Sequence, residues 1–147
     1  MISPASQYAL RALAYLGRRE SEGPALARNI AAAEGIPRAF LSKILLQLAT
    51  HGLVRSQKGP RGGFTLGRPA DQIHINDVML VVDGPQRPEK RCMFGRAECN
   101  ASKACPLHDS WAEIQAHFQN TVGALTIREL ANRPDRQTQD PRATVPS

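Results

Sequence analysis

Apolar residues recur at steps of three and four in three successive segments of the N-terminal half, a spacing typical of amphipathic helices. The first predicted helix covers residues 4–18. A second begins at Pro24 and ends at Gly35, and a third begins at Ile36-Pro37 and ends at Gly52. Because only a very short glycine-containing turn separates the last two helices, the pattern predicts a helix-turn-helix.

The spacing changes after the third helix. Residues 53–57 and 64–66 are typical of β-strands, and the glycine-rich segment Lys58-Gly59-Pro60-Arg61-Gly62-Gly63 lies between them. A β-hairpin that directly follows a helix-turn-helix is a wing. We therefore expect a fold that is mainly α with a small β-wing, which is a winged helix-turn-helix domain.

A short extended piece is expected at residues 73–75. Asn76 is a good helix cap, so a fourth helix is predicted to begin there and to end at Gly84. Two prolines in Pro85–Arg91 indicate a linker.

A long C-terminal helix is predicted from Pro106, because apolar residues recur from Leu107 to Leu125 at helical steps. This stripe is longer than a small N-terminal bundle can cover, so we interpret the helix as the dimerisation helix, with plain intramolecular packing as the alternative. The residues expected at the dimer contact are Trp111, Ile114, Phe118 and Val122. Thr126-Ile127-Arg128-Glu129 is typical of a capping box and predicts a last short helix.

These elements predict four regions. They are a winged helix-turn-helix domain at 1–84, a linker and cysteine loop at 85–105, the dimerisation helix and short terminal helix at 106–132, and a disordered tail at 133–147.

The positive charge of the chain is concentrated in its N-terminal half. Residues 1–70 hold ten Lys and Arg against three Asp and Glu, an excess of seven, whereas residues 71–132 hold six against eight. A localised basic excess on a helix-turn-helix with a wing indicates double-stranded DNA as the partner, although a solvated basic surface has the same composition. The candidate DNA-contacting residues are Arg38, Ser42, Lys43 and Gln47 on the third helix and Arg55, Lys58 and Arg61 on the wing.

All three cysteines of the chain lie in one loop, which ends at a histidine. Six residues separate Cys92 from Cys99, five separate Cys99 from Cys105, and two more lead to His108. Such a donor set suits a transition metal or an iron–sulfur cluster, and a thiol redox switch is the alternative. We also expect Pro106 to begin the following helix, which would place Cys105 at its N-cap and His108 in its first turn. The odd cysteine count argues against a disulfide framework.

The sequence resembles the Rrf2-type winged-helix transcriptional regulators, which include the iron–sulfur cluster regulator, the nitric-oxide-sensitive repressor and the rhizobial iron regulator. The resemblance extends from residue 1 to about residue 132. Four features carry it: Tyr8-Ala9-Leu10-Arg11, Gly52-Leu53-Val54, Gly59-Pro60-Arg61-Gly62-Gly63-Phe64, and three cysteines ahead of a long helix.

The resemblance implies a homodimer on a partly palindromic operator and an iron–sulfur cluster, [2Fe-2S] or [4Fe-4S], held by Cys92, Cys99 and Cys105. His108 occupies the place of the histidine ligand of the iron–sulfur cluster regulator. Other members take a carboxylate from the partner's first helix, and the matching position here is Gln7.

The leading interpretation is therefore a transcriptional regulator, most simply a repressor, that senses iron, iron–sulfur status, nitric oxide or redox state. A structural zinc site is the main alternative for the loop, because three cysteines and a histidine form an ordinary zinc shell. An enzyme is not expected, since no nucleophile–base pair, paired carboxylates or nucleotide motif is present, and no small-molecule substrate is expected. The sequence shows no membrane-spanning stretch and no signal peptide, and its clustered free cysteines predict a cytoplasmic protein.

Overall fold

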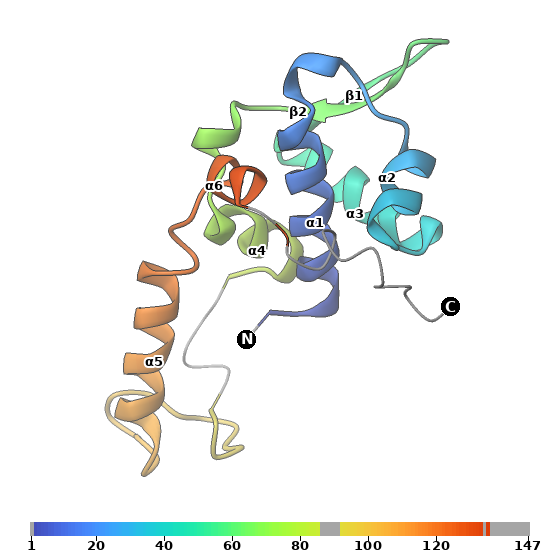
Figure 1. Ribbon diagram of the computed structural model, residues 1–147. Helices are drawn as coiled ribbons and strands as arrows, with labels where there is room; N and C mark the ends of the chain where they lie inside the picture. The colour runs from blue at the N-terminus through green and yellow to red at the C-terminus, as the bar shows by residue number, and fades with distance from the viewer. Residues whose placement is uncertain (1, 86–91, 134, 136–147) are drawn as a thin grey trace, which may run out of the picture.

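The computed structural model describes residues 2–85, 92–133 and 135. Figure 1 shows a helical body with a two-stranded hairpin at one end, and α5 projecting from the opposite side with the cysteine loop at its far end. The elements are α1 (Pro4–Arg18), η1 (Glu20–Glu22), α2 (Ala27–Glu34), α3 (Arg38–Thr50), β1 (Val54–Gln57), β2 (Gly63–Leu66), η2 (Ala70–Gln72), α4 (Ile75–Asp83), α5 (His108–Asn120) and α6 (Ile127–Asn132).

Helix α1 lies in the middle of the body and contacts α2, α3, α4, α6 and β2. It begins at Pro4, where the Ser3 side chain caps the helix by accepting from the backbone N–H of Ser6. Its buried positions are mostly small, which lets neighbouring helices approach closely; they are Ser6, Ala9, Ala12, Leu13, Ala14, Leu16 and Gly17.

The predicted helix-turn-helix is present as α2 and α3. Gly35 ends α2 in the left-handed conformation, at φ 62°, which a residue without Cβ adopts at little cost. Helix α1 holds both helices in place. The Tyr8 ring meets the ring of Phe40 on α3 edge to face, with centroids 5.9 Å apart, and the Arg11 guanidinium lies 3.8 Å from the Glu34 carboxylate on α2.

The predicted wing is also present, with β1 and β2 antiparallel in the register Val54↔Leu66 to Gln57↔Gly63. The start of the second helix was predicted wrongly, since α2 begins at Ala27 and not at Pro24. The backbone of Ala25 pairs instead with Phe64 of β2, through two hydrogen bonds of 3.0 and 2.8 Å. Because of this pairing, the chain just before Ala27 is extended and not helical, and it is hydrogen-bonded to the wing.

Helix α4 begins one residue earlier than predicted, and His74, not Asn76, is its N-cap. The side chain of Asp77 accepts from the backbone N–H of His74, so the cap is satisfied without Asn76. The Asn76 side chain donates to the carbonyl of Gln119 in α5. At the other end of α4, the hydroxyl of buried Ser6 donates to Asp83 over 2.7 Å, which joins α4 to α1.

The C-terminal helix is shorter than predicted. Helix α5 has 13 residues and ends at Asn120, so Val122 and Leu125 lie beyond it. The following turn is bound to the start of α4: the carbonyl of Gly123 accepts from Asn76 N–H and that of Leu125 accepts from Ile75 N–H, each over 2.9 Å. We call these two hydrogen bonds the α4–α5 clamp. If α5 continued past Asn120, the carbonyls of Gly123 and Leu125 would be needed for its own backbone hydrogen bonds, but the clamp uses both of them.

The predicted capping box of the last helix is confirmed, because Thr126 and Glu129 cap α6 reciprocally. Helix α6 packs on α1, where Gly17 lies against Ile127 and Ala131. In the described parts of the chain, no helix is long and apolar enough to cross a membrane. The linker prediction at 86–91 and most of the predicted tail at 133–147 fall outside the described residues.

Gly63→Ala is expected to destabilise the fold more than Gly59→Ala, although both glycines have positive φ, at 144° and 104°. A Cβ at Gly63 would lie 2.6 Å from the carbonyl oxygen of Ala25, whereas a Cβ at Gly59 would meet nothing within 4 Å. Gly59→Ala should therefore cost only the conformational term of about 1 kcal/mol, and Gly63→Ala about 2 kcal/mol or more. Chemical denaturation of both variants measures the difference, and equal losses would contradict the tight contact.

Candidate metal centre and DNA interface

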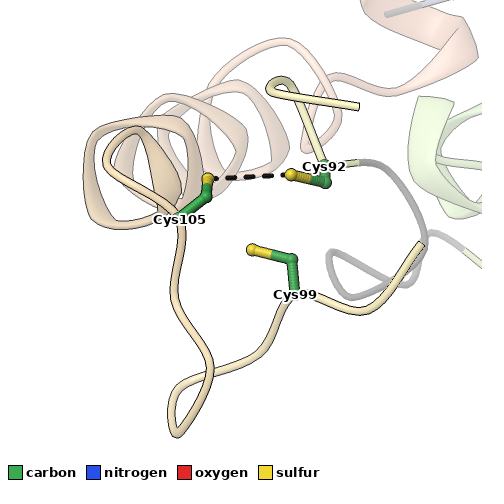
Figure 2. A group of neighbouring side chains, drawn as sticks. All are labelled: Cys92, Cys99 and Cys105. Carbon is green, nitrogen blue, oxygen red and sulfur yellow. Dashed lines mark hydrogen bonds between the residues drawn. The ribbon is translucent and has the colours of Figure 1, made fainter. Parts of the chain in front are cut away.

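The three cysteines converge on one point. Their sulfur atoms all lie within 4.8 Å of one another, and Cys92 Sγ lies 3.6 Å from Cys105 Sγ. Figure 2 shows the three cysteine side chains directed toward one another from different points of the loop. The chain continues from Cys105 into α5. All three thiols are free, and the burial of Cys99 and Cys105 is nearly complete, at 3% and 6% exposure.

His108 joins this cysteine triad from one side. Its Nδ1 lies 3.2 Å from Cys99 Sγ. The prediction that Cys105 caps the helix was wrong, because the N-cap of α5 is Leu107 and the helix begins at His108. The carbonyl of Cys105 accepts from the backbone N–H of His108 over 3.1 Å, which closes a turn through Pro106 and Leu107 ahead of the helix. His108 is in the first turn, as predicted.

Local hydrogen bonds shape the loop between the cysteines. The side-chain oxygen of Asn100 accepts from the backbone N–H groups of Ser102 and Lys103, over 3.0 and 2.9 Å. Gly95 turns the chain at φ 80° and donates its N–H to the Cys92 carbonyl. These short-range contacts bend the chain so that sulfurs from both ends of the loop face inward.

The thiols have unequal electrostatic surroundings. Hydrogen bonding from the backbone of Arg96, helped by that of Phe94, lowers the pKa of Cys92 from 9.0 to about 7 despite its partial burial. The backbone of Cys105 acts to lower the pKa of Cys99, but burial together with the neighbouring thiols Cys105 and Cys92 outweighs it and raises that pKa. Cys92 is therefore the thiol that ionises more readily of the two.

This donor set fits a thiolate-bound metal centre. Two sulfurs on one tetrahedral ion, with metal–sulfur bonds of about 2.3 Å, lie about 3.8 Å apart. The distance of 3.6 Å between Cys92 and Cys105 Sγ is close to that value. Three thiols and an imidazole suit either zinc or iron–sulfur chemistry, so the donors alone leave the metal open.

The predicted DNA-contacting residues lie on two surfaces. Arg38, Ser42 and Lys43 are exposed along the first half of α3, and the Ser42 hydroxyl donates back to the Arg38 carbonyl. Gln47 is exposed, but its side chain donates to the Val81 carbonyl of α4 over 2.8 Å. That contact gives Gln47 a place in the packing of α3 on α4. The wing residues Arg55, Lys58 and Arg61 are exposed along the hairpin.

A groove of about 410 Å³ lies between the first turn of α2, the start of α3 and the part of the wing next to its glycine-rich turn. Arg28 and Arg38 both line it. Sequence reasoning missed Arg28, because it places α2 from Pro24 onward and gives no sign that Ala25 pairs with the wing. A basic residue directly after an extended segment was the only available signal.

The predicted dimerisation residues lie on or just beyond α5, a helix in which no residue is fully buried. Ile114 is 53% exposed and Val122, past the end of the helix, is 38% exposed, while Trp111 and Phe118 are partly buried. The apolar side of α5 is thus incompletely covered within one chain.

Comparison with known proteins identifies the family to which this chain belongs. The chain is 34% identical over 134 residues, 90% of its length and 92% of the relative's, to a candidate HTH-type transcriptional regulator of Aquifex aeolicus. It is 30% identical to the HTH-type transcriptional regulator IscR of Serratia proteamaculans, over 95% of this chain and 87% of the relative. The structure of CymR, described as the global cysteine regulator of B. subtilis, superimposes with a TM-score of 0.76 at 25% identity, covering 92% of this chain and 98% of that one. A family model described as Rrf2, iron-dependent transcriptional regulator, matches residues 2–133, and the chain belongs to this family of transcriptional regulators.

Proposed function

We propose that this transcriptional regulator binds operator DNA as a homodimer, and that an iron–sulfur cluster held by Cys92, Cys99, Cys105 and His108 sets its affinity. The observation that carries the proposal is the convergence of three thiols within 4.8 Å, with an imidazole 3.2 Å from one of them. The description of the matching family as iron-dependent supports iron over zinc. Repression is the simplest consequence, because a bound dimer covers the DNA that it occupies.

A bound cluster would supply a group whose state changes with iron supply, oxidants or nitric oxide. The chain supplies the connection from the loop to DNA. Cys105 is joined to the start of α5 by its hydrogen bond to His108, and the far end of α5 is held by the α4–α5 clamp. Helix α4 in turn accepts from Gln47 of α3. A change in the loop therefore reaches the helix proposed to read DNA through packed elements and hydrogen bonds.

The second candidate is a structural zinc site on the same DNA-binding fold. The compactness of the triad favours it, since sulfurs 3.6 Å apart match two ligands of a single tetrahedral ion. In that case the loop would keep its shape whatever the iron supply, and the regulator would sense something else or act as a thiol switch after metal loss.

Substitution of Cys92, Cys99 or Cys105 by Ala is expected to abolish the visible absorption of the anaerobically reconstituted protein, since each change removes a thiolate from the cluster. His108→Ala should retain part of the cluster with a shifted spectrum, because a nitrogen ligand bears less charge than a thiolate. Iron and acid-labile sulfide per chain are measured alongside the spectrum.

Ser102→Ala is the matched control, since Ser102 is exposed in the same loop and is not a proposed ligand. It should bind iron and sulfide as the unmodified protein does. Zinc alone in a protein prepared with iron and sulfide under anaerobic conditions would reject the cluster and leave the zinc site.

Lys43→Ala is expected to change the DNA sequences that the protein selects from a random duplex pool. Lys43 is exposed on α3, and its ammonium group forms no ion pair or hydrogen bond with any residue in the described part of the chain. Its ammonium group is therefore available to a base edge. Thr50→Ala, at the end of the same helix, is the control and should select the same sequences as the unmodified protein. An equal loss on selected and random DNA would make Lys43 a phosphate contact only.

Ile114→Glu is expected to convert the dimer to a monomer, because it would bury an unpaired charge at the interface, at a cost of about 3 kcal/mol or more. In a single chain the same change is tolerable, since Ile114 is 53% exposed. Ala116→Glu is the control: residue 116 is exposed and lies about 200° around the helix from residue 114. Light scattering gives the mass of each variant, and a dimeric Ile114→Glu protein would contradict the proposed interface.

A further inference from the structure

We propose that the groove between α2, α3 and the wing binds one phosphodiester of the DNA backbone, and that Arg28 and Arg38 hold it. We call it the wing groove. The inference rests on the proposed DNA-binding function and deepens it, because it assigns to Arg28 of α2 a contact that lies outside the recognition helix and outside the wing tip.

The first step is charge. Arg28 and Arg38 come from two different helices and line the same groove. Neither guanidinium group forms an ion pair or hydrogen bond with another residue that the structure describes, and no carboxylate lines the groove. Four arginines on α1, at its C-terminal end and on α6 are instead paired within the chain: Arg11 and Arg18 with Glu34, Arg19 with Glu22, and Arg128 with Glu20. Two guanidinium groups left without a counter-ion in one concave site favour an anion there.

The second step is rigidity. The two hydrogen bonds between Ala25 and Phe64 hold the start of α2 against β2 just before Arg28. The wing side of the groove is lined by Ser56, Gln57 and Phe64 together with the glycines Gly59, Gly62 and Gly63. A Cβ at Gly62 would lie only 2.4 Å from the Gln57 carbonyl oxygen, so the hairpin turn on this side of the groove is tightly folded.

The third step is position. In the proposed complex α3 enters the major groove and the wing reaches the backbone or the adjacent minor groove. The DNA backbone strand that separates the two grooves must then pass between α3 and the wing, two of the elements that line the wing groove. A phosphodiester carries one negative charge and accepts paired hydrogen bonds from guanidinium, so it matches the two arginines.

The test is a salt titration with a random-sequence DNA duplex, because a backbone contact needs no particular operator. Arg28→Ala should weaken binding and reduce the slope of log affinity against log salt by about one unit. Arg28→Lys keeps the charge and should keep most of the slope. Arg18→Ala removes an arginine that is paired with Glu34 and should leave the slope nearly unchanged.

Three results would overturn the inference. The first is an unchanged slope in Arg28→Ala while the unmodified protein binds duplex DNA, which leaves the proposed function standing. The second is an affinity loss confined to selected sequences, which would make Arg28 a base-reading residue. The third is saturable calorimetric binding of inorganic phosphate that Arg28→Ala removes without any effect on DNA, which would make the groove a site for a free anion. Failure of the unmodified protein to bind any duplex at low salt would instead overturn the proposed function itself.

Discussion

The close packing of helices around α1 is the constraint on which the other parts depend. Small residues on α1, such as Ala9 and Ala12, are fully buried, so its neighbours approach its backbone directly. At Gly17 the approach of α6 is close: a Cβ there would lie 3.2 Å from Ile127 and 3.3 Å from Ala131 of α6. Since α1 also contacts α2, α3 and α4, the helix-turn-helix, α4 and α6 are all positioned by packing against the same helix.

Helix α4 connects this body to α5, the helix that follows the cysteine loop. One end of α4 is bound to the turn after α5 through the α4–α5 clamp, and near the other end the Val81 carbonyl accepts a hydrogen bond from the Gln47 side chain of α3. A Cβ at Gly123 would lie 2.1 Å from Asn76 Oδ1, so a side chain there would displace the Asn76 amide, which donates to the Gln119 carbonyl. Helix α5 has no fully buried residue of its own, so its direction is set by the clamp at one end and the cysteine loop at the other.

Local signals made much of this structure predictable, and contacts between distant segments account for the errors. The helix-turn-helix, the wing and the grouping of the cysteines follow from residues that are neighbours in sequence. The true start of α2 depends on Ala25 pairing with Phe64, and the role of Gln47 depends on Val81, far along the chain in both cases. The end of α5 before Val122 follows from the clamp, which no helical periodicity reveals. Amphipathic spacing predicts which side of a helix is apolar. It does not predict whether N–H groups from another segment will bind the carbonyls near the end of that helix.

The cysteine loop has little besides its ligands to hold it in shape. Met93 and Phe94 are 64% and 55% exposed, whereas Cys99 and Cys105 are buried, so the thiols occupy the place that apolar side chains fill in an ordinary loop. Ionising several thiols within 4.8 Å of one another is unfavourable, and a bound cation removes that repulsion while holding the loop closed. Local bonds such as those to Asn100 are individually weak. If the cysteine triad holds the proposed metal, loss of that metal should therefore open this loop before any other part of the fold, and the change would reach α5 through the Cys105–His108 turn.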